Sequence, residues 1–464
     1  MWFRHPRKWR LRHQAAWLAC CIPQIAMASA RCSEELASDK FDRYVKANPR
    51  AEAERVEVEP QVEPMVQLRR IMQEAANRSS SIGAARLLAE AAEYDVSETK
   101  AGRWPMVSVN GNWSRTQTKV DEVTASQRLA SVSLNMNGNL YDGGRLQKLM
   151  AYREELANAA KYGHAVTQDQ VVLEAVSAAL ERSRYKLQAQ VYQQYMRKMS
   201  CLVEALEGIV AEDRGRTSEL IQVRKTQAQT ELQRDQALAQ SRQSELKVKR
   251  LIGNLAVTSE GFTLPLSSVP DLGEVQRLMD KGSDVSQLRT QAEAAETYAQ
   301  AIRAGQRPQV NWSVGQSGGK QGSASVSTLQ TGVTVSYSLF NGFSDDASYQ
   351  SAMRRALATK AQLEDLLAVK QARTAEIHDM ATSAFDRAKR YVDVLRDSER
   401  VRNFTFQQWS QIGKRSLFDV MSAESDHFNL RISYVNALYD GYQASAQLRS
   451  LGSGLSSWAG LGTR

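Results

Sequence analysis

The sequence is poor in cysteine, proline and histidine, and each shortage excludes a class of protein. Its 464 residues include four cysteines, nine prolines and five histidines. Once an N-terminal leader is removed, only Cys32 and Cys201 remain, which excludes a disulfide framework and leaves one bridge possible. So few prolines leave room for long, uninterrupted helices. The histidines stand apart and form no triad or metal-ligand cluster, so we expect no enzymatic activity, no metal and no cofactor.

Long apolar runs and a concentrated charge of one sign are also missing. Beyond residue 30, no stretch reaches the about 20 apolar residues of a transmembrane helix. The net charge of +9 belongs partly to the leader, and the other basic residues are spread among glutamates, which excludes nucleic-acid binding. Gly318-Gly-Lys320 resembles a phosphate-binding loop, but Val314 replaces its first glycine and a glutamine follows the lysine.

Residues 1–30 have the features of a secretory signal peptide. Five basic residues precede an uncharged and mostly apolar stretch from Ala15 to Ala28, and small residues predict cleavage after Ala28 or Ala30. The leucine expected three positions before a lipidated cysteine is missing upstream of Cys20, so we expect no lipid anchor. Residues 31–65 include a stretch rich in Glu, Val and Pro, and we expect this segment to be flexible.

The most informative feature that is present is a duplication. Four landmarks recur in the same order, at offsets of 198 to 203 residues. They are Ala101-Gly-Arg-Trp-Pro105 and Ala304-Gly-Gln-Arg-Pro308, Leu140-Tyr-Asp-Gly143 and Leu339-Phe-Asn-Gly342, Gly215-Arg-Thr-Ser218 and Gly413-Lys-Arg-Ser416, and Leu251-Ile-Gly253 and Leu451-Gly452. Such a long period predicts a duplicated half-molecule, not a solenoid. We expect a first repeat over residues 66–255, a linker over 256–270, a second repeat over 271–455 and a tail over 456–464.

Each repeat contains segments in which apolar and polar residues alternate. In Val107–Trp113 and Val132–Leu140 every second residue is apolar or glycine, and Val333–Leu339 repeats the pattern. Segments of about 9–11 residues fit tilted membrane strands with an apolar outer face and a wet inner face. The candidate lumen residues are Ser108, Asn110, Asn112, Ser133, Asn135 and Asn137 in the first repeat and Thr334, Ser336 and Ser338 in the second.

These segments predict one strand pair over residues 106–141 and another over 308–340. The polar stretches 116–127 and 316–328 are expected to be outward loops. The strands of a soluble β-sandwich also alternate between apolar and polar residues, but two strands in each repeat are too few to build a sandwich. Because a four-stranded sheet in a membrane cannot leave its edges unpaired, we expect the chain to close its sheet with copies of itself.

Long helices surround the strands. A first helix is expected from Val66 to Lys100, and long helical hairpins over residues 145–252 and 344–452, with turns at Gly215 and Gly413. The first arm of each hairpin has about 66 residues and would be roughly 100 Å long. Helices of this length are stable only when they supercoil with partners.

Taken together, these motifs resemble the TolC family of outer-membrane efflux and type I secretion channels. The most specific are Leu339-Phe-Asn-Gly342, the turn from Gly413 to Asp419 and Leu448-Arg-Ser-Leu-Gly452, and the resemblance spans about Met65 to Leu455. It implies an α+β membrane protein: a trimeric 12-stranded β-barrel, four strands per chain, continuous with a long α-helical coiled-coil tunnel. It also implies a homotrimer in the outer membrane of a Gram-negative-type cell, with most of the chain in the periplasm.

The resemblance further implies partners and a gate. The partners would be a periplasmic adaptor (membrane fusion) protein, an inner-membrane ABC or proton-driven pump, and outer-membrane lipid. At the periplasmic tip, Arg415 and Asp419 match family residues that tie neighbouring helices shut, whereas Ser422 and Ile221 replace family aspartates. The candidate tip residues are Asp419, Arg415, Gly413, Gly215 and Glu219. A simpler interpretation makes Asp419 a solvated residue at a helix N-terminus, favoured by the helix dipole.

The sequence does not distinguish two functions of such a channel, namely efflux of small molecules and type I secretion of a large protein. The missing lipid anchor favours secretion slightly, because many drug-efflux members of the family are lipoproteins. The main alternative is an exported coiled-coil scaffold without a channel. Long helices fit that alternative equally well, whereas the alternating strands and the duplication favour the channel.

Overall fold

The computed structural model describes residues 63–120, 123–254, 262–321 and 324–461. The predicted signal peptide, nearly all of the predicted flexible segment and part of the predicted linker lie outside these residues. The chain divides into two compact units. Among the described residues, the helix unit comprises 63–78, 172–254, 262–271 and 375–449, and the sheet unit comprises 79–120, 123–171, 272–321, 324–374 and 450–461.

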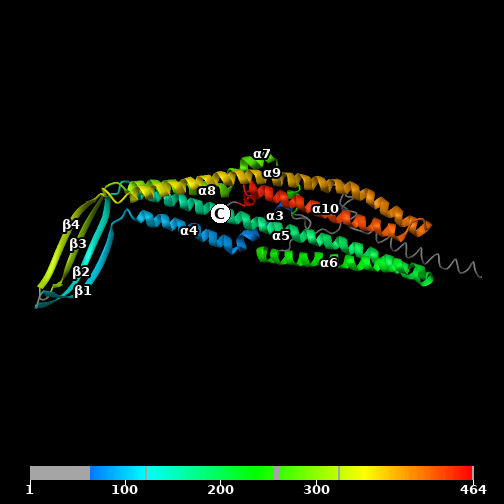
Figure 1. The fold of residues 1–464 in the computed structure, drawn as a ribbon, viewed down its shortest axis with the longest axis horizontal. Helices are drawn as coiled ribbons and strands as arrows, with labels where there is room; N and C mark the ends of the chain where they lie inside the picture. Colours follow the sequence, from blue (N-terminus) through cyan, green and yellow to red (C-terminus); the bar gives the residue numbers. More distant parts are fainter. Residues whose placement is uncertain (1–62, 121–122, 255–261, 322–323, 462–464) are drawn as a thin grey trace, which may run out of the picture. The chain divides into compact units, whose positions relative to one another are not determined.

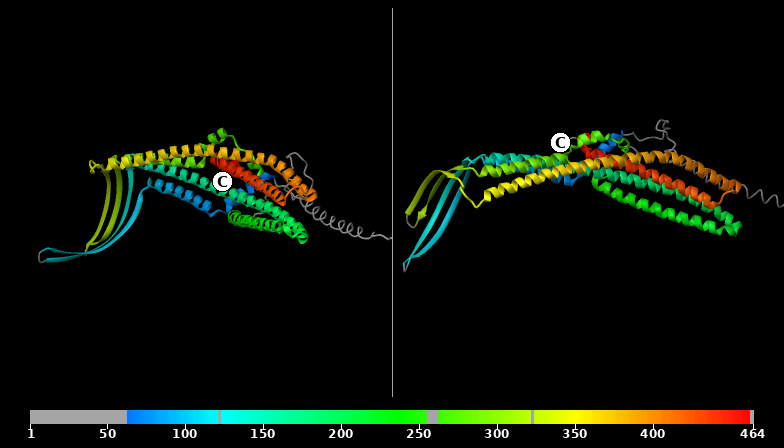
Figure 2. Two further views of the ribbon diagram at one scale, coloured as in Figure 1. Left: turned by 45° about the vertical axis from the view of Figure 1, so that its right-hand side comes forward. Right: turned by 45° about the horizontal axis from the view of Figure 1, so that its top comes forward.

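The sheet unit contains one antiparallel sheet of four strands. They are β1 (Met106–Val120), β2 (Val123–Tyr141), β3 (Gln309–Gln321) and β4 (Ala324–Ser336), in the order β1-β2-β3-β4. Figures 1 and 2 show the strands side by side in this order. Each repeat contributes one hairpin, and β2 joins the two hairpins by pairing with β3. Within the part of the chain that the structure describes, strands β1 and β4 are therefore the edges of the sheet.

Two differences from the predicted strands have a physical cause. The strands have 15, 19, 13 and 13 residues, so most of the two stretches expected to be outward loops is strand. Ladder pairing continues there because threonine favours strands and polarity alone does not interrupt backbone hydrogen bonds. The second difference is that β4 ends at Ser336, opposite Gln309, the first residue of β3. Ser338, predicted to line the lumen, has no strand left to pair with and lies outside the sheet.

The strand-to-helix junctions explain a landmark of the duplication. Helix α5 (Arg145–Glu212) follows Asp142, whose carboxylate accepts hydrogen bonds from the backbone N–H groups of Gly144 (2.9 Å) and Leu146 (2.6 Å). Gly143 and Gly144 both have left-handed φ angles, 69° and 86°. Before helix α9 (Ser344–Gln407), Gly342 and Phe343 adopt the same conformation, at 67° and 63°. The second repeat thus keeps the geometry although a phenylalanine replaces the second glycine.

Shorter helices complete the sheet unit. They are α4 (Ser80–Ala101), α7 (Leu272–Met279), α8 (Ser283–Gly305) and α11 (Leu455–Trp458). Alanine side chains dominate the buried face of α8, which allows close helix packing. Surface pairs such as Lys100–Glu154 (2.9 Å) and Lys360–Glu296 (2.6 Å) connect neighbouring helices. Near the end of the chain, Asp169 accepts a hydrogen bond from the backbone N–H of Ser456 (3.0 Å).

The first predicted helix is in fact two. Helix α3 (Pro64–Arg78) belongs to the helix unit, and α4 begins after Ser79, whose hydroxyl accepts a hydrogen bond from the backbone N–H of Ile82 (3.4 Å). The helix unit also contains the C-terminal parts of α5 and α9, together with α6 (Thr217–Ile252) and α10 (Leu417–Leu451). Among the described residues, no helix is both long enough and apolar enough to cross a lipid bilayer.

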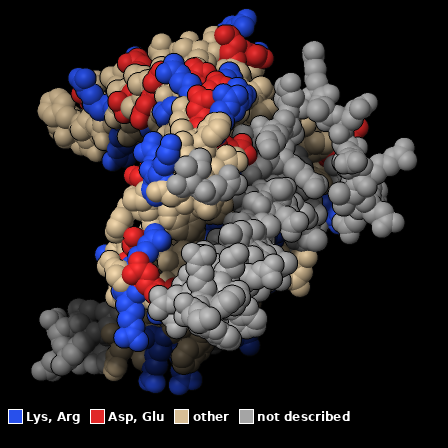
Figure 3. All heavy atoms as spheres, turned by 90° about the vertical axis from the view of Figure 1, so that its right-hand side faces the viewer, with Lys and Arg blue, Asp and Glu red and all other residues tan. Residues whose placement is uncertain are grey.

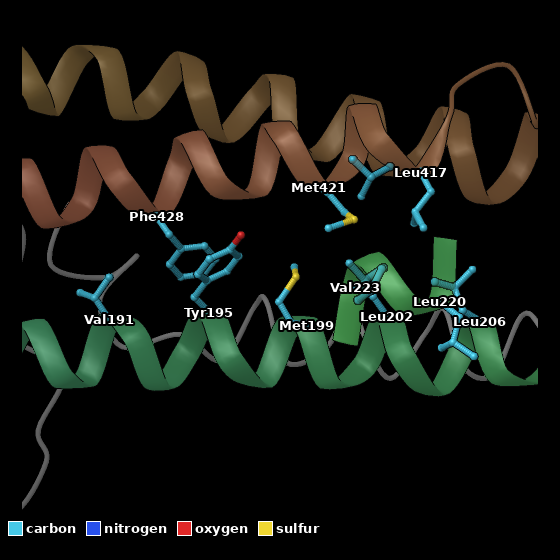
Figure 4. Close-up of a cluster of buried hydrophobic side chains, with 11 residues drawn as sticks. Val191, Tyr195, Met199, Leu202, Leu206, Leu220, Val223, Leu417, Met421 and Phe428 are labelled. Atoms are coloured by element: carbon cyan, nitrogen blue, oxygen red, sulfur yellow. The ribbon is translucent and has the colours of Figure 1, made fainter. Parts of the chain in front are cut away.

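The core of the helix unit is a hydrophobic cluster where α5, α6 and α10 meet. Its members are Val191, Tyr195, Met199, Leu202, Leu206, Leu220, Val223, Leu417, Val420, Met421 and Phe428. Figure 4 shows the side chains of α5 pointing towards those of α10, with the rings of Tyr195 and Phe428 stacked at a centroid distance of 4.7 Å. Cys201, between two of these α5 residues, is disulfide-bonded, and the other three cysteines lie outside the described residues.

Candidate functional site

The turn between α9 and α10 carries the main predicted tip residues. Helix α9 ends in a π-helical turn, η3 (Gln408–Ile412), and Gly413 closes it with a left-handed φ of 64°. The backbone N–H of Gly413 donates to the carbonyl oxygen of Gln408, as does that of Lys414 (3.2 Å). Glycine suits this position because it adopts left-handed angles without strain. The prediction that Gly413 makes the turn thus has a structural reason.

Ser416 and Asp419 form a capping box at the start of α10. The Asp419 backbone N–H donates to the Ser416 hydroxyl (3.2 Å), and the Ser416 backbone N–H donates to the Asp419 carboxylate (3.1 Å). This reciprocal pair satisfies two backbone groups that a helix N-terminus otherwise leaves unpaired. Asp419 therefore has a structural role at the helix N-terminus, as the simpler sequence interpretation supposes, while its side chain stays 45% exposed.

Arg415 connects the two arms of this turn. Its Nε donates to Oε1 of Gln408 (3.1 Å), and its Nη1 lies 4.0 Å from Oδ2 of Asp419. The structure thus brings the two predicted gate residues together. Both side chains are about half exposed, and such ion pairs contribute at most about 1 kcal/mol. The Arg415–Asp419 contact is therefore weak enough to be exchanged for another partner.

The turn between α5 and α6 is built differently. Gly215 lies in a short 3₁₀ helix, η1 (Arg214–Arg216), and its backbone N–H donates to Oδ1 of Asp213 (2.9 Å). Its φ angle is not left-handed, so this glycine is favoured by the close carboxylate and not by its backbone angle. Glu219 pairs with Arg216 at 2.7 Å, and Ile221 is exposed. The acidic charge of Glu219 is thus compensated within its own turn.

Behind the α9–α10 turn, five ionisable side chains are buried together. Their exposed fractions are 0% for Glu424, 1% for Arg431, 2% for Arg402, 3% for His427 and 6% for Lys198. Glu424 lies 3.5 Å from Lys198 Nζ and 4.0 Å from Arg402 Nη1. Helices α5, α9 and α10 therefore meet at one carboxylate, whose two ion pairs join them.

This buried charge cluster carries more positive than negative charge. Burial, and then the charges of Arg402 and Arg431, lower the pKa of His427 from 6.5 to about 3, so this histidine is neutral. Arg431 donates to the side chain of Gln194 and lies over the ring of Phe428, at 5.2 Å from its centroid. The cluster was not predicted from the sequence, because charged residues on a long helix are usually exposed to solvent and nothing in their spacing indicates burial. Sequence reasoning also missed Asp213, Gln408 and Ser416, although the Ser-x-x-Asp spacing of the capping box was visible.

The second group of predicted site residues lies in the sheet. Ser108 pairs with Asn135 and Asn110 with Ser133, while Val107 pairs with Met136 and Val109 with Leu134. In the second hairpin, from Gln309 to Trp312, polar residues again pair with polar residues and apolar residues with apolar ones. Its polar pairs include Asn311 with Thr334 and Gln309 with Ser336, and its apolar pairs include Val310 with Val335 and Trp312 with Val333. The sheet thus has one face of serine, asparagine and threonine and one mainly apolar face.

Acidic and basic side chains lie next to one another on part of the molecular surface. Figure 3 views the face that lies to the right in Figure 1, and acidic and basic side chains are intermixed in its upper part. This distribution fits the local pairs described above, such as Arg216–Glu219 and Arg224–Glu207 (2.6 Å).

Comparisons with known proteins agree with this geometry. Residues 275–453 match the family model "Outer membrane efflux protein". No curated protein sequence matches the chain significantly. Among solved structures, CusC, described for its folding and transmembrane channel formation, matches with a TM-score of 0.75 at 18% identity, covering 84% of this chain and 92% of CusC.

Two further structures match over nearly their whole length. The outer membrane protein VceC of Vibrio cholerae matches with a TM-score of 0.73 at 18% identity, covering 84% of this chain and 97% of VceC. The open state of the outer-membrane channel MtrE of Neisseria gonorrhoeae matches with a TM-score of 0.70 at 15% identity, covering 88% of this chain and 98% of MtrE. Each is named as a channel or a membrane protein, not as an enzyme.

At these identities the solved structures establish the fold, and the family model identifies the second half of the chain. The matched family and structures also agree on the outer membrane, the location that the sequence predicts. The predicted resemblance is therefore confirmed at the level of the fold: residues 275–453 match the outer membrane efflux protein model, and the chain has the fold of the solved outer-membrane channels.

Proposed function

We propose that three copies of this chain form a channel in the outer membrane that serves as the passive exit duct of an envelope-spanning export system. The observation that carries the proposal is the sheet, which has a polar face, an apolar face and two edges that pair with no other strand of the described residues. In a bilayer, unpaired strand edges are costly, so the sheet must close with copies of itself.

The strand count favours three copies. A barrel of about 8 strands, from two copies, is filled by its own side chains, whereas about 12 strands leave room for an aqueous lumen. The serine and asparagine face would line that lumen, and the apolar face would contact lipid. Ser338 is not part of this lining, since it lies beyond the end of β4.

The long helices support a tunnel. Helices α5 and α9 have 68 and 64 residues, which corresponds to roughly 100 Å each. Several apolar side chains of α9 are left about half exposed within the chain, including Leu357, Val369, Met380, Val394 and Val401. Copies of the same helix packed around an axis would cover them, as coiled coils do.

The gate would lie at the two helix turns. Arg415 holds Gln408 and Asp419 only weakly and remains exposed, so it is free to pair with a carboxylate of a neighbouring copy. Three Asp419 carboxylates around a narrow axis would attract cations. Gly413 and Gly215 shape the two turns, and Glu219 adds little charge because Arg216 compensates it.

A duct of this kind needs partners that supply energy. We assign these roles to a periplasmic adaptor protein and an inner-membrane ABC or proton-driven pump. Loss of the chain should then leave the cargo inside the cell: antibiotic sensitivity would identify small-molecule efflux, and loss of a protein from the medium would identify type I secretion. The competing function is a coiled-coil scaffold without a channel. Loss of such a scaffold would change neither antibiotic sensitivity nor the amount of protein in the medium.

Conductance measurements test the channel and its gate together. We expect detergent-resistant trimers and ion conductance in planar bilayers. Asp419→Asn keeps an acceptor for the capping box but removes the charge, and should reduce cation selectivity and raise the open fraction. The control is Asp397→Asn, an exposed α9 carboxylate that pairs with Arg400 at 3.4 Å. A monodisperse soluble monomer would refute the channel, and unchanged conductance of the Asp419 variant would remove this residue from the gate.

A further inference from the structure

Three basic residues of the sheet, Arg115, Arg128 and Lys320, lie on one face. Over their described bounds, the four strands contain Arg115, Lys119, Arg128 and Lys320 and no acidic residue. By alternation, Arg115 shares the face of Trp113. Arg128 pairs with Arg115, and Lys320 pairs with Ala130, so both belong to this same apolar face. None of these three residues lies on the serine and asparagine face.

These three residues, Arg115, Arg128 and Lys320, also lie within two residues of one level of the strands. On β2, the apolar face runs from Leu140 to Ala130, and Arg128 is the next residue on that face. Ten residues span about 33 Å along a strand, or roughly 25 Å across a membrane at a strand tilt of about 40°. That height equals the apolar band of an outer-membrane barrel. The basic residues therefore follow directly where the apolar band ends, on the side away from the helices.

A hollow lies beside them on the sheet. Its volume is about 560 Å³, and its lining includes Gly111, Trp113, Val132, Gly318 and Lys320. A Cβ atom added at Gly111 or Gly318 would meet nothing within 4 Å, so these two glycines leave the floor open. The indole of Trp113 is 78% exposed and forms an apolar wall. The hollow thus offers apolar surface next to positive charge.

The arrangement of the positive charges favours the binding of an anion. Arg115 and Arg128 lie directly opposite each other on β1 and β2, an arrangement in which like charges destabilise a sheet. Lys320 is a diagonal neighbour of Arg128, at roughly 7–8 Å between backbones. Guanidinium groups bind phosphate in a bidentate manner, so one or two phosphates between these side chains would offset the repulsion.

We propose that this hollow binds a phosphate-bearing lipid of the outer leaflet. Its phosphates bridge Arg115, Arg128 and Lys320, and an acyl chain lies against Trp113 over the two glycines. The proposal rests on the proposed function, since it takes the apolar face to be the lipid-facing one. A lipid is favoured over free phosphate because only a lipid fills the apolar hollow as well as satisfying the charges.

Binding of fluorescent bisphosphorylated lipid A to the purified full-length protein in detergent tests this. The triple variant Arg115→Gln/Arg128→Gln/Lys320→Gln should bind at least tenfold more weakly than the native protein. The matched control Lys389→Gln/Arg396→Gln/Arg400→Gln removes three exposed charges from α9 and should bind normally. A second variant, Gly318→Leu, fills the hollow without changing the charge and should also weaken binding.

Three outcomes would overturn the proposal. Equal binding by the triple variant and its control would exclude the basic residues. Equal binding of dephosphorylated lipid A would exclude the phosphates. Displacement of lipid A by inorganic phosphate alone would make the site an anion site without a lipid. Conductance is measured on every variant, so loss of lipid binding with intact conductance separates this site from the channel, whereas a native protein without conductance refutes the channel itself.

Discussion

Replacing Glu424 by glutamine should destabilise the helix unit strongly. This side chain is fully buried and is the carboxylate that faces both Lys198 and Arg402. Glutamine has nearly the same shape, so the change removes a charge and leaves the packing intact. What remains is a buried set of cations, Lys198, Arg402 and Arg431, from three different helices.

The magnitude follows from the distances. At an effective dielectric constant of about 20, a charge pair at 3.5 Å attracts by about 5 kcal/mol and a pair at 4.0 Å by about 4 kcal/mol. Desolvation of the ions offsets much of this attraction in the native protein. Removing one partner leaves that desolvation in place, so we expect a loss of about 3–5 kcal/mol.

Hydrogen–deuterium exchange of the full-length protein measures this loss locally. The amides of α10 around Glu424 should exchange at least about 100-fold faster, since each 1.4 kcal/mol corresponds to a factor of ten. Adding Lys198→Met should restore part of the protection, because it removes one of the two cations that face the position of Glu424. The control is Glu207→Gln, which breaks the exposed pair with Arg224 and should change little. Exchange as slow as in this control would refute the assignment of Glu424 as the centre of the cluster.

Two further predictions concern pH and backbone geometry. The pKa of His427 is about 3 in the folded state, against an ordinary value of 6.5, so between these two pH values the unfolded state binds one more proton than the folded state. The free energy of unfolding should therefore be highest above about pH 6.5 and fall by up to about 1.4 kcal/mol for each pH unit below it. In urea unfolding experiments, the free energy of unfolding of His427→Gln should depend less on pH between about pH 6 and 4 than that of the native protein. The control His378→Gln should keep the native pH dependence. In thermal melts, Gly143→Ala should lose more stability than Gly144→Ala. Both residues have left-handed angles, but only at Gly143 would a Cβ lie 2.6 Å from the carbonyl oxygen of Ala304; equal losses would contradict this.

The sequence predicted the fold well where a pattern has a fixed period. Alternation identified the two faces of the sheet, and the register confirms that Ser108 and Asn135 share one of them. Boundaries were harder to predict, because the ends of β4 and the break at Ser79 depend on a pairing strand and a single capping hydroxyl. The burial of Glu424 could not be predicted, since no local pattern shows which charge on a long helix meets cations from two other helices.

The magnitudes distinguish the exposed contacts of the α9–α10 turn from the buried contacts behind it. The exposed Arg415–Asp419 pair contributes at most about 1 kcal/mol, whereas removing Glu424 costs several times more. The packing of α5, α9 and α10 is therefore maintained inside the chain by the buried charge cluster and the hydrophobic cluster. The pairs at the turns can break and form without unfolding these helices.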